Sequence, residues 1–159
     1  MSRAIVLDTS VLGVASNPNA SAAPCRAWID SILQSSSHLV IPAVADYEVR
    51  RELIRQGNQT GIASLDALCA KSIYIAMDDA ALKKAAWYWA QFRNTFGKQP
   101  TDPTAHRLDA DVLICSQAWW YADTHGIPAV IATDNIKDFT PLLDDRFVVD
   151  ANRWNAIAP

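Results

Sequence analysis

Short apolar runs alternate with stretches of helical periodicity along the whole chain, and this alternation limits the fold more than any other feature. Helices are predicted at residues 23–33, 44–56, 62–70 and 110–124, with a longer one from Asp78 or Asp79 to Gly97. Strands that alternate with helices favour a three-layer α/β/α sandwich with a mostly parallel central sheet. The apolar runs predict strands at residues 4–7, 38–41, 73–76, 129–132 and 147–149.

The length of 159 residues fits one domain, residues 1–159, that can bury a sizeable core. Half of the residues are hydrophobic and 19% are charged, which favours a packed globule over a disordered chain. No apolar run approaches the length of a membrane span, and residues 1–3 lead directly into a strand, so we expect neither a membrane segment nor a signal peptide. Cys25, Cys69 and Cys115 have no CxxC spacing and no nearby His, which predicts buried thiols in a reducing cytoplasm.

The charge balance bears on possible partners. A net charge of −3 is not typical of a protein that binds nucleic acid through bulk charge. Basic residues cluster at positions 50–55 and 83–93, and the simplest interpretation is a solvated helix face. In the helix that ends at Gly97, helical spacing predicts a buried stripe, and the loop that follows, 98–106, is long enough to be functional. The predicted stripe consists of Leu82, Ala85, Trp89, Phe92 and Phe96.

Five carboxylates are predicted to meet at the carboxyl edge of the sheet. Asp8 directly follows the first strand, and Asp134 follows strand 129–132. Glu48 lies in the first turns of helix 44–56. Asp109 and Asp111 flank the start of helix 110–124. Ligands of open parallel sheets bind at this edge, so the five acids are candidates for one site.

Each acid also has an ordinary structural interpretation. Asp8 or Asp109 could cap the helix that follows, and Asp111 could be a first-turn acid. Glu48 could pair with Arg51 or Arg55 on a solvated face, and Asp134 could hold a turn.

Taken together, the acids favour a metal site, because like charges on one rim repel unless a cation or protons neutralise them. Oxygen ligands without Cys or His select Mg²⁺ or Mn²⁺ over zinc. Such ions activate water and stabilise the leaving oxygen of a phosphodiester, so the set predicts metal-assisted phosphoester hydrolysis. We expect Asp8, Asp111 and Asp134 to ligate the metal, with Asp109 and Glu48 acting directly or through water. Thr9, Ser10 and Thr133 would orient the carboxylates or the phosphate.

Other chemistries fit less well. The sequence holds no GxxxxGK[ST] or GxGxxG nucleotide-binding loop. Asp8-Thr9-Ser10 lacks the second Asp of a DxD phosphatase motif. A response-regulator receiver would place a phosphoacceptor Asp at the end of a middle strand, whereas strand 73–76 leads into a helix.

Four segments in order give the chain a resemblance to the PIN-domain family, and within it to VapC-type toxins. Residues 5–12 resemble the first motif of that family, with Asp8 in place of its first acid and Ser10 as the supporting polar residue. Glu48 matches a glutamate on the second helix, and residues 111–118 are similar to D-x-x-I-A-A-x-A, with Cys115-Ser116 replacing the small pair.

Residues 133–139 resemble the closing motif T-x-[ND]-x-x-D-F. The Asn or Asp position of that motif falls on Asn135, whereas the carboxylate here is Asp134, so either residue could face the metal. Asp138 matches the second acid of the motif. Asp109 is an additional acid beside Asp111.

The resemblance implies a Mg²⁺- or Mn²⁺-dependent endoribonuclease that cuts single-stranded RNA in the cytoplasm. It also implies a homodimer and a cognate antitoxin whose C-terminal segment occupies the active-site groove. The alternative from another class is a catalytically silent PIN-like module that binds a basic partner peptide or RNA at its acidic rim.

Overall fold

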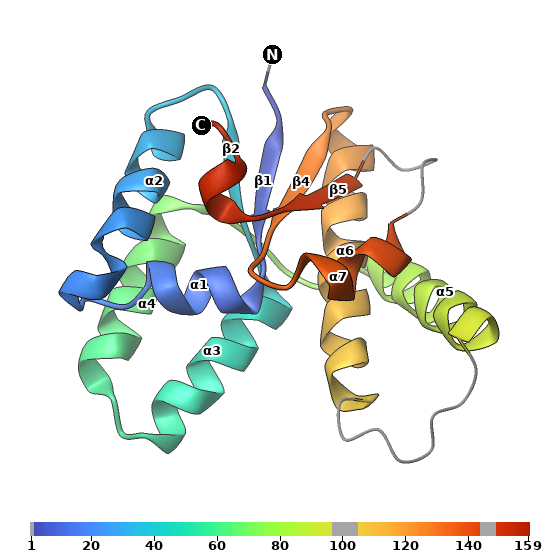
Figure 1. The fold of residues 1–159 in the computed structure, drawn as a ribbon, viewed down its shortest axis with the longest axis horizontal. Helices are drawn as coiled ribbons and strands as arrows, with labels where there is room; N and C mark the ends of the chain where they lie inside the picture. The colour runs from blue at the N-terminus through green and yellow to red at the C-terminus, as the bar shows by residue number, and fades with distance from the viewer. Residues whose placement is uncertain (1, 97–104, 144–148) are drawn as a thin grey trace.

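A five-stranded parallel sheet forms the centre of the structure, a computed structural model that describes residues 2–96, 105–143 and 149–159 (Figure 1). The strands stand in the order β3-β2-β1-β4-β5, and each neighbouring pair is parallel. The chain moves outward from β1 to β3 and then crosses back to place β4 on the other side of β1. This reversal creates a switch point at the carboxyl ends of β1 and β4, where ligands of such sheets bind. The strands are β1 (Ala4–Leu7), β2 (His38–Pro42), β3 (Ile73–Ile75), β4 (Ala129–Ala132) and β5 (Val149–Asn152).

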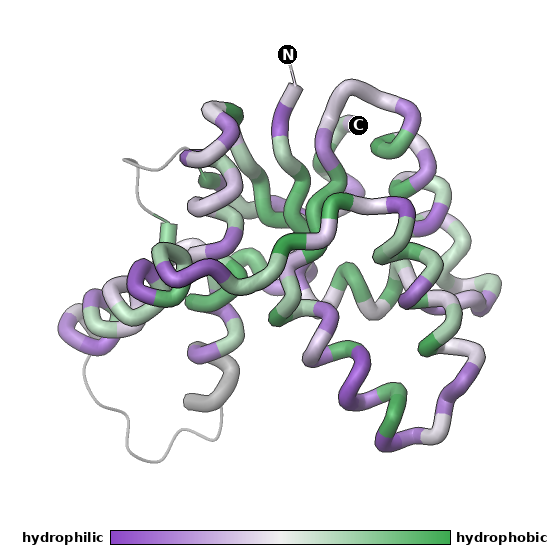
Figure 2. The backbone as a smooth tube through the Cα atoms, turned by 180° about the vertical axis from the view of Figure 1, so that it is seen from behind, coloured by the Kyte–Doolittle hydropathy of each residue, from purple (hydrophilic) through white to green (hydrophobic). Residues whose placement is uncertain are grey.

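Helices cover both faces of the sheet, which confirms the predicted α/β/α architecture. Figure 1 shows α1 to α4 on one side of the strands and α5 and α6 on the other. All four residues of β1 are buried, because a central parallel strand has helices on both of its faces. In Figure 2 the strands, coloured green where they are hydrophobic, accordingly lie in the middle of the molecule. The helices are α1 (Thr9–Ala15), α2 (Ala23–Leu33), α3 (Ala43–Arg55), α4 (Gln59–Lys71), α5 (Asp79–Phe96), α6 (Ala105–His125) and α7 (Ile136–Phe139).

Helix α6 begins at Ala105, five residues earlier than the sequence pattern predicts. Residues 105–110 contain no Gly or Pro, so nothing in their sequence stops the helix from extending toward its amino end. The interpretation of Asp109 as a helix cap is therefore wrong, because it lies inside the second turn. Asp109 and Asp111 both project from the regular part of the helix.

The last strand also differs from its prediction, because β5 occupies residues 149–152 and residues 147–148 lie outside the described part. Val149 and Ala151 are buried, whereas Asp150 is exposed and Asn152 is half-buried. This alternation is typical of an edge strand, and a search for continuous apolar runs does not detect it.

The buried face of α5 is rotated from the predicted stripe. Ala81, Ala85 and Tyr88 are buried, whereas Leu82 is 51% and Trp89 41% exposed. The buried face of α5 thus combines two small alanines with the large ring of Tyr88, and Leu82 and Trp89 remain at the surface. The side chain of Phe96, the predicted end at Gly97 and the loop through residue 104 lie outside the described part.

Within the described part, no helix is both long enough and apolar enough to cross a membrane. The three thiols are free. Cys25 and Cys115 are buried, as predicted, whereas Cys69 is only half-buried. Burial raises the pKa of the Cys25 thiol to about 11, so this thiol stays protonated and unreactive at neutral pH.

Candidate active site

Asp8 lies where β1 ends and α1 begins, and its carboxylate makes three hydrogen bonds. The backbone N–H of Thr9 donates to Oδ1 at 2.6 Å, and Asp8 is the N-cap of α1. Ser10 Oγ and Thr133 Oγ1 donate to Oδ2 at 2.9 and 2.7 Å. Asp8 is only 4% exposed. The cap interpretation is confirmed, and among the described residues it leaves the second carboxylate oxygen, Oδ2, bound only to side-chain hydroxyls.

The two hydroxyls connect β1 to the segment that follows β4. The backbone N–H of Asp134 donates to Ser10 Oγ at 3.2 Å, and that of Asn135 donates to Thr133 Oγ1 at 2.9 Å. Each hydroxyl therefore accepts one hydrogen bond and donates another to Asp8. This arrangement fixes the Asp8 carboxylate relative to α7.

Glu48 approaches the same place from α3. Thr9 Oγ1 donates to Glu48 Oε2 at 2.6 Å, and Arg51 Nη2 lies 3.4 Å from Oε1. The Arg51 side chain is 58% exposed, so this ion pair is worth little. Thr9 thus joins Asp8, through its backbone, and Glu48, through its hydroxyl.

A cavity of about 270 Å³ lies between these acids. Four separate chain segments contribute to it, all at the carboxyl edge of the sheet. The cavity therefore brings together acids that are far apart in the sequence. Its walls are formed by Asp8, Thr9, Ser10, Glu48, Ala110, Asp111, Asn135 and Asp138.

Asp109 lines a neighbouring cavity of about 350 Å³ instead. Successive residues of an α-helix turn by about 100°, so Asp109 and Asp111 point in different directions from α6. Ala110, between them, lines both cavities. The acidic cavity thus receives one of the two neighbouring acids.

Asp134 does not line the acidic cavity, although its backbone is bound to Ser10. Its side chain is exposed, and its negative charge is a minor cause of the raised pKa of Cys25 in α2, after burial. Asn135 and Asp138 line the cavity in its place; they are three residues apart, a spacing that puts them on one side of a helical turn. From the sequence, Asp138 is predicted only as the second acid of the closing motif, and the D-F pair of that motif is the signal that points to it.

The pKa of the Asp8 carboxyl is raised above its ordinary value, chiefly because burial disfavours the charged form. Hydrogen bonds from Thr133, Ser10 and Thr9 act in the opposite direction, and the negative charge of Glu48 raises the pKa further. All three donors are neutral groups. An added cation would therefore stabilise the ionised form of Asp8.

The acidic cavity fits a hydrated divalent ion. Among the described residues, no three His, Cys, Asp or Glu side chains stand close enough to hold a bare metal ion as they are arranged. Mg²⁺, however, keeps several of its waters and needs only one or two carboxylates as direct ligands. The cavity offers carboxylate, amide and hydroxyl oxygens, which are the donors that Mg²⁺ and Mn²⁺ prefer, and no thiol or imidazole.

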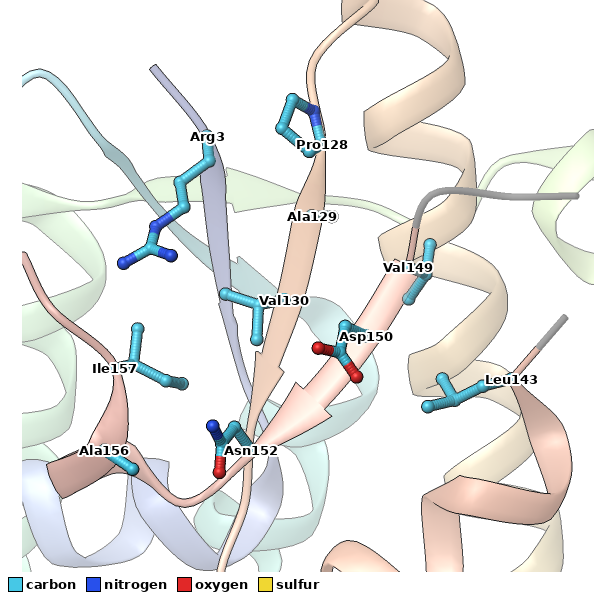
Figure 3. Close-up of a pocket in the computed structure, with 10 residues that line it drawn as sticks. All are labelled: Arg3, Pro128, Ala129, Val130, Leu143, Val149, Asp150, Asn152, Ala156 and Ile157. Carbon is cyan, nitrogen blue, oxygen red and sulfur yellow. The ribbon is translucent and has the colours of Figure 1, made fainter. Parts of the chain in front are cut away.

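A larger cavity, of about 570 Å³, lies between β4, β5 and the C-terminal segment (Figure 3). Its charged residues are Arg3 and Asp150, and Arg3 donates a hydrogen bond to the carbonyl oxygen of Ala158. Figure 3 shows Val130 and Ile157 on opposite walls. None of the residues predicted for the site lines this cavity, so its size does not make it the candidate active site.

Comparison with known proteins identifies the fold. No model of a known protein family and no curated protein matches the sequence. Solved structures do match over nearly the whole chain. VapBC2 from Rickettsia felis, bound to a DNA fragment from its promoter, aligns with a TM-score of 0.66 and 14% identity over 94% of this chain and 98% of the other.

Two further solved structures have the same fold over nearly the whole chain. VapBC-1 from nontypeable Haemophilus influenzae has a TM-score of 0.63 and 14% identity, over 96% of this chain and 98% of the other. FitAcB from Neisseria gonorrhoeae has a TM-score of 0.61 and 20% identity, over 96% and 99%. Likeness at such low identity establishes the fold and leaves the activity to be argued from the site. The chain has the α/β/α fold of the PIN domain.

Proposed function

We propose that this protein is a divalent-cation-dependent endoribonuclease that cuts single-stranded RNA. The observation that carries the proposal is the cavity at the carboxyl ends of β1 and β4, where Asp8, Glu48, Asp111 and Asp138 come together with Asn135. Carboxylates gathered around one small cavity repel one another, and a bound cation would reduce that repulsion. The fold shared with VapBC and FitAcB structures supports the same chemistry.

One or two of Asp8, Asp111 and Asp138 would bind the cation directly, and the remaining acids, with the amide oxygen of Asn135, would bind its waters. A bound Mg²⁺ or Mn²⁺ lowers the pKa of water and stabilises negative charge on phosphate oxygens, which is what phosphodiester hydrolysis requires.

The protein's own hydroxyl groups would keep this arrangement in place. Ser10 and Thr133 hold Oδ2 of Asp8, and Thr9 holds Glu48. The carboxylates are thereby oriented before substrate binds, so no free energy is spent on orienting them during the reaction.

We further propose that the protein acts as the toxin of a toxin–antitoxin pair and forms a homodimer. The three matched structures carry VapBC or FitAcB in their names, which supports an antitoxin as the partner. An acidic cavity that opens at the surface is suited to a basic segment of such a partner, because opposite charges steer association.

The test of the nuclease proposal is cleavage of single-stranded RNA by the purified protein with Mn²⁺ or Mg²⁺, with and without EDTA. Wild type should cut only with the divalent ion, and Asp111→Asn should lose about 100-fold or more, because even outer partners of a metal site are worth ~10–100-fold. Asp123→Asn is the matched control: Asp123 is an exposed acid on the same helix, about 18 Å further along, and this variant should cut like wild type. Cleavage that survives EDTA, or an active Asp111→Asn, would contradict the proposal.

The alternative of a silent binding module gives a different result in the same experiment. It predicts no cleavage under any metal condition, together with binding of a basic peptide that weakens when salt is added.

A further inference from the structure

A second cavity adjoins the acidic one between α3 and α6. It measures about 350 Å³, and it shares Glu48 and Ala110 with the acidic cavity. This volume is at the small end of the ~300–1,000 Å³ range that holds small ligands. Its walls are formed by Ala43, Val44, Tyr47, Glu48, Arg51, Asp109, Ala110 and Leu113.

Tyr47 gives this cavity an aromatic wall beside the acids. The side chain is 61% exposed, and the guanidinium of Arg51, one helical turn later, lies 5.2 Å from the centre of its ring. Arg51 also pairs with Glu48 at 3.4 Å. The half-buried side chains of Val44 and Leu113 add an apolar surface.

The composition of the cavity fits a planar, uncharged group that carries N–H donors. Tyr and Arg present flat faces on which an unpaired base stacks. The carboxylates of Asp109 and Glu48 accept hydrogen bonds from N–H groups and repel phosphate. A nucleobase has this chemistry, whereas the sugar–phosphate backbone does not. Since Glu48 also lines the acidic cavity, a base here would belong to a nucleotide next to the linkage that is cut.

We propose that the cavity between α3 and α6 is a base-binding subsite, in which the Tyr47 ring, with Arg51 over its other face, stacks one unpaired base of the RNA substrate. This inference rests on the proposed ribonuclease function. It makes Tyr47 a positioning residue that distinguishes single strands from duplexes, because a paired base cannot leave its stack without cost. Asp109 would favour bases that present N–H groups.

The test uses a single-stranded RNA oligonucleotide whose cut position has been mapped, and matched oligonucleotides with an abasic residue on either side of the cut. Tyr47→Ala should lower kcat/KM about 5- to 150-fold, the value of one base stack, mainly through KM. Tyr47→Phe should retain activity, because it keeps the aromatic face. Wild type should cut one of the two abasic substrates with a similarly lowered kcat/KM. Tyr47→Ala should cut that abasic substrate with the same kcat/KM as the intact oligonucleotide, because the stacking interaction is already lost.

Trp89→Ala is the matched control. Trp89 is also an exposed aromatic residue one helical turn before an arginine, with Arg93 5.4 Å from its ring centre, but it lines neither cavity. This variant should cut every oligonucleotide like wild type.

Binding in EDTA separates this inference from the proposed function. The probe is an oligonucleotide with the fluorescent base 2-aminopurine at the position that the abasic series identifies, or at successive positions if no RNA is cut. Wild type should quench the fluorescence of this base, and Tyr47→Ala should not. Quenching without any cleavage would leave the subsite standing and overturn the nuclease. Equal cleavage and equal quenching by wild type and Tyr47→Ala would overturn the subsite. So would a Tyr47→Ala variant that loses only the binding of a basic partner peptide, because the cavity would then be a peptide site.

Discussion

Thr133 Oγ1 donates a 2.7 Å hydrogen bond to Oδ2 of Asp8, across 125 positions of sequence. Both residues are buried at the ends of neighbouring strands, β4 and β1. The bond connects the two halves of the sheet at its switch point. It also lowers the pKa of an acid whose burial raises it.

Thr133→Val should therefore affect both stability and activity. Valine keeps the shape but removes a donor to Asp8 and an acceptor for the N–H of Asn135. The expected loss is roughly 1–3 kcal/mol in the free energy of unfolding, measured in urea. The pH–rate profile for RNA cleavage should shift to higher pH, because without this hydrogen bond the pKa of Asp8 is higher and Asp8 ionises at higher pH.

Thr133→Ser is the control for this variant, because it retains the hydroxyl. It should keep the position of the pH–rate profile. A profile that does not move in Thr133→Val would show that the hydrogen bond leaves the ionisation of Asp8 unchanged.

The stability of the metal-free protein should depend on pH through Asp8. Its pKa is raised in the folded state, so its contribution to stability is complete below the ordinary Asp pKa and is lost as pH rises through the raised value. Ionised Asp8 therefore destabilises the metal-free fold at neutral pH. Asp8→Asn should melt higher than wild type at pH 7 in EDTA by a few degrees, since about 1 kcal/mol moves Tm by ~2–4 °C in a chain of this size.

The measurement is a series of thermal melts from pH 3 to pH 8. The difference between Asp8→Asn and wild type should be smallest at acid pH, where Asp8 is protonated. Identical curves at neutral pH would contradict a destabilising charge at this position.

Divalent ions should remove this destabilisation. Mg²⁺ or Mn²⁺ at about 100 times its Kd should stabilise wild type by ~2.7 kcal/mol, because it binds the folded state. The same concentration should shift the Tm of Asp8→Asn or Asp111→Asn far less, whereas Asp123→Asn should respond like wild type. Equal shifts in all four proteins would indicate an ion bound elsewhere.

Asp138 and Asp134 should differ in their importance for cleavage. Asp138 lines the acidic cavity, whereas Asp134 is exposed and does not line it. Asp138→Asn should reduce kcat/KM by ~10-fold or more, and Asp134→Asn should change it by less than about 3-fold. The reverse order would make Asp134 the ligand after all.

Much of the fold follows from local sequence. The predicted helix 23–33 coincides with α2, and strands 4–7 and 129–132 coincide with β1 and β4. These elements are easy to predict because their apolar residues are buried on a single helix face or on both faces of a strand, and periodicity reports that directly. Asp8 is equally predictable, since the end of a central strand is fixed by the strand itself.

The sequence by itself determined the parallel sheet, the edge at which the acids gather and the position of Asp8. Only the tertiary structure decided which of two nearby residues lines the cavity: Asp111 over Asp109, and Asn135 over Asp134. The physical reason is rotation. Neighbouring residues point in different directions, and the direction that faces the cavity depends on where a helix begins and how it packs against the sheet. The same cause placed Ala81 in the core and Leu82 at the surface of α5.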